Sequence, residues 1–254
     1  MYLNIEYNDI TDFSALDCLY SLQTSRSKPR LTIRQPADLE RLATLTNLTS
    51  LELGIDHTIN DEPWLDLTPL SQLTRLTRLE LYGPGIDDLT PLQTLSELTY
   101  LRIVSSCLAD LRPLRFLRKL SVLNISCSKF LSDLSPLAAL TKFIKLDLTG
   151  KSQIADLSPL QGLTELYYLR CWDAKITDIS PLASLSKLTY LNLVNNQITD
   201  ISPLRSLMNL RQLYINGNPI ADTSPLLNLP KLEYSSARNQ RITVVAATHD
   251  PATP

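Results

Sequence analysis

A five-residue pattern, D-x-[S/T/R]-P-L, occurs eight times along this 254-residue chain at nearly constant spacing. Successive prolines of the pattern lie 22, 22, 23, 23, 22, 22 and 22 residues apart and make up half of the 16 prolines in the chain. They are Pro69, Pro91, Pro113, Pro136, Pro159, Pro181, Pro203 and Pro225. A fixed period of this length is typical of solenoids, in which each unit packs only against its neighbours.

A short run of alternating aliphatic residues precedes each proline segment, as in LNLVN at 191–195. Alternate side chains of a strand point to opposite faces. We therefore expect Leu191 and Leu193 to point into the core and Asn192 and Val194 to point outward. Each unit is thus predicted to contribute one short strand to a shared sheet.

The proline segment is predicted to form a short helical turn, of the 3₁₀ kind that is common in such brief segments. In DISPL at 200–204, the Ser202 hydroxyl is expected to act as the N-cap and Pro203 to take the first helical position. The repeated aspartate can accept backbone N–H groups near this turn. A catalytic carboxylate needs a singular environment, so the repetition favours a structural role. These aspartates are Asp88, Asp110, Asp133, Asp156, Asp178, Asp200 and Asp222.

The full unit has the pattern L-x-x-L-x-L-x-x-(N)-x-I-x-D-[I/L]-S-P-L-x-x-L. It resembles the 22-residue leucine-rich repeat of bacterial internalins and of the phosphatase-1 regulators. The resemblance covers nearly the whole chain and implies an α/β repeat solenoid. That fold is a leucine-rich repeat horseshoe with a parallel β-sheet on the concave face and short 3₁₀ or irregular turns on the convex face. These families are scaffolds for protein recognition.

The repeat predicts one domain over residues 1–245, with about ten to eleven units that are degenerate in 1–66, and a mobile tail over 246–254. The Asn position of the unit is filled by Asn8, Asn196 and Asn218, whose side chains are expected to bond the backbone of the turn. Central units carry Pro84, Ser106 and Ala174 there instead, which predicts altered turns or bound water. The insertion around His57 is expected to be a solvated loop and not a metal site.

Composition gives no support for several function classes. The net charge of −2 offers no basic footprint for nucleic acid and no polybasic segment for membranes. The N-terminus lacks a secretory signal pattern, no run of 18 apolar residues occurs, and the four cysteines form no C-x-x-C motif. We therefore expect free thiols and a cytoplasmic location. With no phosphate loop and no nucleophile motif, the sequence predicts neither an enzyme nor a cofactor.

Outward positions of the strands form three columns across the concave face, and these columns hold most of the tyrosines. Tyr, Trp and Arg are enriched at interface hot spots, although tyrosine also suits an exposed sheet face for its β-propensity alone. The candidate partner-binding residues are Tyr82, Tyr100, Arg102, Tyr168, Arg170, Trp172, Tyr190, Asn192, Tyr214 and Tyr234. The favoured hypothesis is a module that binds a protein partner through this face. The alternative is a non-catalytic spacer or targeting segment of a larger signalling or effector protein.

Overall fold

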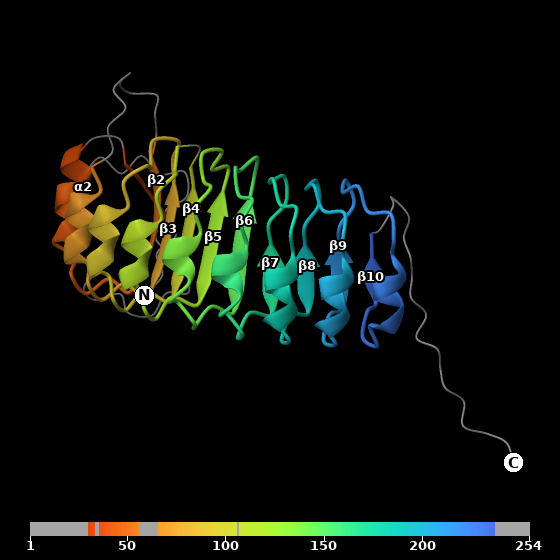
Figure 1. The fold of residues 1–254 in the computed structure, drawn as a ribbon. Coiled ribbons are helices and arrows are strands. Elements are labelled where there is room, and N and C mark those ends of the chain that lie inside the picture. The colour runs from red at the N-terminus through yellow and green to blue at the C-terminus, as the bar shows by residue number, and fades with distance from the viewer. Residues whose placement is uncertain (1–29, 34–35, 56–65, 106, 237–254) are drawn as a thin grey trace, which may run out of the picture.

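The computed structural model describes residues 30–33, 36–55, 66–105 and 107–236. Within these ranges ten strands form one parallel sheet, ordered β1 to β10 as in the sequence (Figure 1). The expected parallel sheet of a leucine-rich repeat solenoid is thus confirmed. The strands are β1 (Arg30–Ile33), β2 (Ser50–Ile55), β3 (Arg78–Tyr82), β4 (Tyr100–Val104), β5 (Val122–Ser126), β6 (Lys145–Thr149), β7 (Tyr168–Arg170), β8 (Tyr190–Asn192), β9 (Gln212–Tyr214) and β10 (Tyr234–Ser235).

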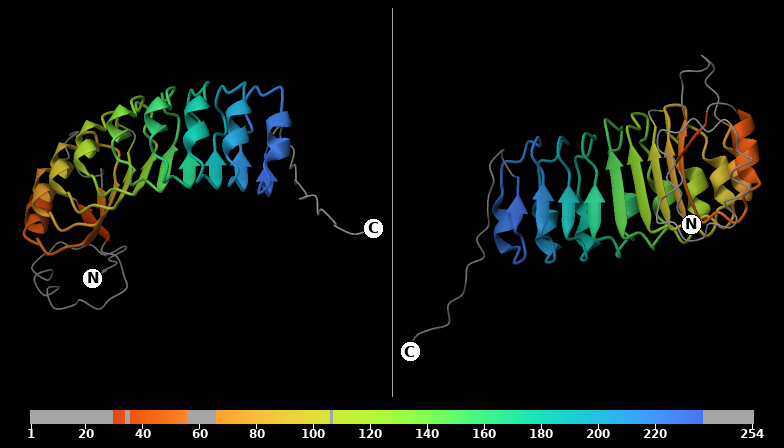
Figure 2. Two further views of the ribbon diagram at one scale, coloured as in Figure 1. Left: turned by 60° about the horizontal axis from the view of Figure 1, so that its bottom comes forward. Right: turned by 180° about the vertical axis from the view of Figure 1, so that it is seen from behind.

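Helical turns cover the other side of the sheet, so that strands line the inside of the curve and turns line the outside (Figure 2). Eight of the turns are the expected 3₁₀ helices. They are η2 (Thr68–Gln72), η3 (Thr90–Thr94), η4 (Arg112–Phe116), η5 (Ser135–Leu137), η6 (Ser158–Leu160), η7 (Ser180–Ser184), η8 (Ser202–Ser206) and η9 (Ser224–Asn228).

One convex element is an α-helix, α2 (Pro36–Ala43), where short 3₁₀ or irregular turns were expected. Its sequence PADLERLA starts with proline and continues with strong helix formers, which supports a full α-helical segment. Leu39 and Leu42, three positions apart, are both buried. This unit therefore fills the same layer with a longer element.

The core is a continuous stack of aliphatic side chains between the sheet and the turns. Leu191 and Leu193 are buried as expected, and so are Ile198 and Ile201 on the return of the chain. Cys171 takes an inward strand position that leucine or isoleucine fills in other units, and its exposure is 0%. Burial raises the pKa of its thiol to about 12. The inward and outward assignment of the repeat is thus confirmed.

The aspartate of each repeat caps the following turn, which confirms its structural role. Its Oδ1 accepts the backbone N–H two residues later at 2.8 Å in all eight units from Asp66 to Asp222. The N–H bond from Ser202 is the main reason that the pKa of Asp200 lies below its usual value.

The expected role of the serine was wrong. In η7 the N-cap residue is Ile179, and Ser180 is already the first helical residue. The Ser180 hydroxyl donates to Asp178 Oδ2 at 2.8 Å and does not accept a backbone N–H. The aspartate two residues upstream already reaches the Ser180 N–H, so it supplies the cap in place of the hydroxyl.

The asparagine position forms the expected bonds to the backbone. Asn196 Nδ2 donates to the carbonyls of Cys171 and Leu193, at 2.9 and 3.0 Å, and its Oδ1 accepts the N–H of Ile176 at 3.1 Å. Asn218 repeats this arrangement one unit later.

In central units that lack the asparagine, buried serines close to that position of the turn bond the backbone. This agrees with the expected altered turns. The Ser105 hydroxyl donates to the Ile86 carbonyl at 2.8 Å, and the Ser128 hydroxyl donates to the Ser105 carbonyl at 2.9 Å.

The two units with an extra residue pass through left-handed backbone at Cys127 and Gly150, with φ of 68° and 111°. The equivalent residues of the following 22-residue units, Asp173, Asn195 and Gly217, also have positive φ. A left-handed residue after the strand is thus a feature of the repeat and not of the insertions.

A second ladder of hydroxyl groups links successive units just before their strands. Thr77 donates to the Thr49 carbonyl at 2.9 Å, Thr99 to the Thr77 carbonyl at 3.0 Å, and Ser121 to the Thr99 carbonyl at 3.0 Å. Thr189 does the same to the Tyr167 carbonyl. In each of these pairs the later unit supplies the donor and the preceding unit supplies the acceptor.

Several expectations fall on residues outside the described ranges. They include the N-terminal region of the domain, the insertion around His57, the thiol of Cys18 and the tail over 246–254. The predicted domain boundaries therefore stay predictions. Among the described residues, no helix has the length and apolar character needed to span a membrane.

We expect Asp178→Ala to lower the free energy of unfolding by about 1 kcal/mol, because the Ser180 N–H loses its acceptor. Asp178→Asn keeps an oxygen that can accept this N–H and should cost clearly less. Urea unfolding followed by circular dichroism measures both changes. Equal losses for the two variants would show that the cap bond is not the source of the effect.

Cys171 should not react with a thiol reagent in the folded protein, whereas the exposed Cys107 and Cys127 should react readily. Mass mapping of the labelled peptides distinguishes the three sites. Labelling in urea is the control, and it should modify Cys171 as fast as the other two. Rapid modification of Cys171 without denaturant would contradict its inward position.

Candidate functional site

All ten candidate residues lie half-buried on the concave face of the sheet or directly beyond the end of a strand. The parallel pairing aligns equivalent positions across neighbouring strands. Tyr168 pairs with Tyr190, and Arg170 pairs with Asn192, which in turn pairs with Tyr214. The sheet therefore presents these side chains as rows that cross the strands.

Four tyrosines on β7 to β10 form a continuous aromatic row, which we call the tyrosine row (Tyr168, Tyr190, Tyr214 and Tyr234). The first two rings stack with centroids 4.3 Å apart and an interplanar angle of 9°. The next two centroid distances are 5.4 and 4.9 Å. Burial raises the pKa of the Tyr168 and Tyr214 phenols. Aromatic side chains with few rotatable bonds thus give this end of the face a surface of rings that pack against one another.

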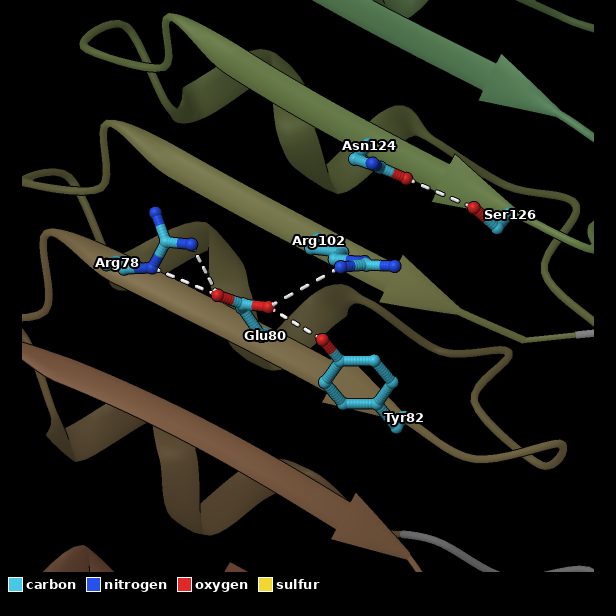
Figure 3. A network of polar contacts seen from close by, with 6 residues as sticks. All are labelled: Arg78, Glu80, Tyr82, Arg102, Asn124 and Ser126. Carbon is cyan, nitrogen blue, oxygen red and sulfur yellow. Dashed lines mark hydrogen bonds and ion pairs between the residues drawn. The ribbon is translucent and has the colours of Figure 1, made fainter. Parts of the chain in front are cut away.

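A polar network occupies β3 and β4 at the other end of the face (Figure 3). Its centre is the buried carboxylate of Glu80. Arg78 donates to Glu80 Oε1 through Nε, at 3.0 Å, and through Nη2. The Tyr82 hydroxyl donates to Oε2 at 2.7 Å, and Arg102 Nη1 lies 4.0 Å from the same oxygen. Burial and the bond to Glu80 raise the pKa of the Tyr82 phenol well above its usual value.

A second charged group lies on β6 and β7. The buried Asp147 accepts a bond from Arg170 Nη1 at 3.1 Å. Burial raises the pKa of Asp147, and the positive charge of Arg170 opposes that shift. Lys145 Nζ lies 4.3 Å from the centroid of the Tyr168 ring, so this group adjoins the tyrosine row.

Sequence reasoning placed Arg78, Glu80, Lys145 and Asp147 in the outward columns but did not select them as site residues. The structure shows that Glu80 and Asp147 hold the selected arginines, Arg102 and Arg170, by charge. The available signal was the alternation of opposite charges along one column. Sequence could not show that both carboxylates are buried beneath their cations.

Aromatic rings support the cations of this face. Arg78 lies 3.4 Å from the centroid of the Tyr100 ring, and Arg102 lies 5.4 Å from that of Tyr82. Such cation–π contacts restrain long side chains that otherwise sample many rotamers. The described residues contain no group of three His, Cys, Asp or Glu side chains that could hold a metal ion. The concave face thus carries cations that are restrained by neighbouring rings and carboxylates.

Comparison with known proteins agrees with this geometry. A family model described as Leucine Rich repeats (2 copies) matches residues 186–228. The chain is similar to the crystal structure of internalin C2 from Listeria monocytogenes, at 34% identity and a TM-score of 0.63. That alignment covers 78% of this chain and 82% of the other chain. Curated proteins give no significant match.

Two further solved structures support the same fold. Internalin InlF from Listeria monocytogenes is 26% identical over 79% of this chain and 77% of that chain, with a TM-score of 0.51. A leucine-rich repeat protein from Leptospira interrogans is 20% identical over 82% of this chain and 64% of that chain, with a TM-score of 0.53. The last likeness shows the fold alone.

Tyr82→Phe should lower the free energy of unfolding by about 1 kcal/mol, because Glu80 loses a hydrogen-bond donor inside a buried network. Tyr214→Phe is the matched control, since the Tyr214 hydroxyl has no hydrogen-bond partner among the described residues. Its loss should leave stability nearly unchanged. Urea unfolding at neutral pH measures the free energy of unfolding of both variants. Equal values for Tyr82→Phe and Tyr214→Phe would count against a structural role for the network.

Proposed function

Because this chain belongs to the internalin-like family of leucine-rich repeat proteins, we propose that it is a recognition module that binds a protein partner through its concave face. The tyrosine row is the observation that carries this proposal. Four adjacent rings on four adjacent strands give a large contact area in a fixed arrangement. Rigid aromatic surfaces of this kind lower the ordering cost of association.

The fold itself favours binding over catalysis, because leucine-rich repeat relatives are generally non-enzymatic binding modules. The proposed binding residues are the ten candidates of the concave face, with Trp172 and Tyr190 near the middle of its aromatic region. A cytoplasmic location stays a prediction. The alternative role is a spacer or targeting segment of a larger protein. The tyrosine row favours the binding role over a spacer, because a spacer has no need of an ordered aromatic surface.

The test is capture of proteins from a cell extract by immobilised wild type and three variants. Tyr190→Ala and Trp172→Ala remove aromatic groups from the concave face. Phe116→Ala removes an exposed aromatic ring from the convex turn η4 and is the matched control. We expect one partner to be retained by wild type and the control and lost by both concave variants.

Titration of the purified partner then measures the loss. Tyr190→Ala should cost about 2 kcal/mol of binding free energy, which is the usual scale of an interface hot spot. Its melting temperature should stay close to that of wild type, because the half-exposed ring leaves no core cavity. If Tyr190→Ala binds normally but melts early, the tyrosine row stabilises the sheet and the proposed binding surface is wrong.

A further inference from the structure

Charge is distributed unevenly along the concave face. The outward columns of β4 to β7, including Trp172 beyond β7, hold three cations and one carboxylate, a formal net charge of +2 in a chain whose total is −2. We call Arg102, Lys145 and Arg170 the basic centre. Towards the N-terminal end, β2 and β3 add Glu52, Arg78 and Glu80. The outward columns of β8 to β10 carry no charged side chain within the described residues.

Exposure increases this asymmetry. The side chains of Glu80 and Asp147 are only 4% and 5% exposed, whereas those of Arg102 and Arg170 are 38% and 31% exposed. The carboxylates thus lie beneath the surface and the guanidinium groups reach it. Between the cations, β5 presents the shorter, uncharged side chains Val122, Asn124 and Ser126. A partner that enters the face at β5 is flanked by positive charge on both sides.

The cations are also held in place before any partner arrives. Arg102 lies near Glu80 and over the Tyr82 ring, Lys145 lies over the Tyr168 ring, and Arg170 bonds Asp147. Cations that are already restrained suit a partner that carries negative charge.

We propose that the partner lays an extended acidic segment across the basic centre and continues over the tyrosine row. This inference rests on the proposed function and specifies the chemistry of the partner. Arg102 and Arg170 are three strands apart, which at about 4.8 Å per strand gives roughly 14 Å. An extended chain spans about 3.4 Å per residue, so two carboxylates about four residues apart match the two arginines.

Two synthetic peptides test this chemistry directly. The first carries two glutamates four positions apart, followed by neutral residues, and the second carries glutamine at both places. Each is titrated into the whole protein while amide NMR shifts are followed. We expect the glutamate peptide to shift residues of β4 to β7 and to bind at least about fivefold more tightly than its glutamine analogue at low salt.

Arg102→Gln and Lys145→Gln should each weaken the glutamate peptide by about fivefold without affecting the glutamine peptide. Lys187→Gln is the matched control, because Lys187 pairs with Glu165 at an exposed site away from this face. It should leave binding unchanged. If Arg102→Gln disturbs the Glu80 network and fails to fold, the affinity of Lys145→Gln for the glutamate peptide is the test of the proposal.

Three outcomes would overturn the proposal: equal binding of the two peptides, shifts that miss β4 to β7, or tighter binding of a single-stranded oligonucleotide of the same charge at these residues. None of them affects the capture experiment with Tyr190→Ala. Loss of a captured partner in that variant, together with equal peptide binding, would keep the recognition surface and remove its acidic specificity.

Discussion

Each unit of this solenoid can bury its leucines only against the units before and after it. A 22-residue turn has one apolar side and no interior of its own, so the core exists only when equivalent residues of successive units lie side by side. The capped turns and the asparagine and hydroxyl ladders all serve this alignment. A left-handed residue recurs after the strand at Cys127, Gly150, Asp173, Asn195 and Gly217, whether or not the unit holds an extra residue.

That constraint explains what the sequence could predict. A periodic core position is apolar in nearly every unit, with Ser235 as an exception, so the inward location of Cys171 followed from its place in the repeat. The role of Asp178 followed in the same way. The sequence did not predict which side chain caps the turn, because the Asp178 carboxylate and the Ser180 hydroxyl can both accept backbone N–H groups there. In the structure Asp178 accepts the Ser180 N–H, and the Ser180 hydroxyl donates to Asp178. The α-helix α2 lies in a unit too degenerate for the repeat to specify.

Outward positions are free of the packing constraint, and the sequence is correspondingly less informative there. It placed the tyrosines on one face but not the order of their stacking, which depends on rotamers of Tyr168 and Tyr190. The buried carboxylates of Glu80 and Asp147 were missed for the same reason. Because periodic packing fixes only the inward residues, the outward ones can acquire aromatic and charged groups without altering the core. The chemistry of the face can thus vary without a change in the aliphatic core, although a network such as that of Glu80 also bonds neighbouring strands.

The hydroxyl ladder gives the solenoid a direction. Thr77, Thr99, Ser121 and Thr189 each donate to a carbonyl of the preceding unit. During synthesis on the ribosome, a newly completed unit therefore meets acceptors that are already in place, and its own hydroxyl needs nothing from residues still to be made. Backbone N–H groups such as those of Gly83 and Leu193 donate in the opposite sense, to carbonyls of the following unit. The last completed unit therefore exposes both donors and acceptors, which water can satisfy until the next unit packs against it.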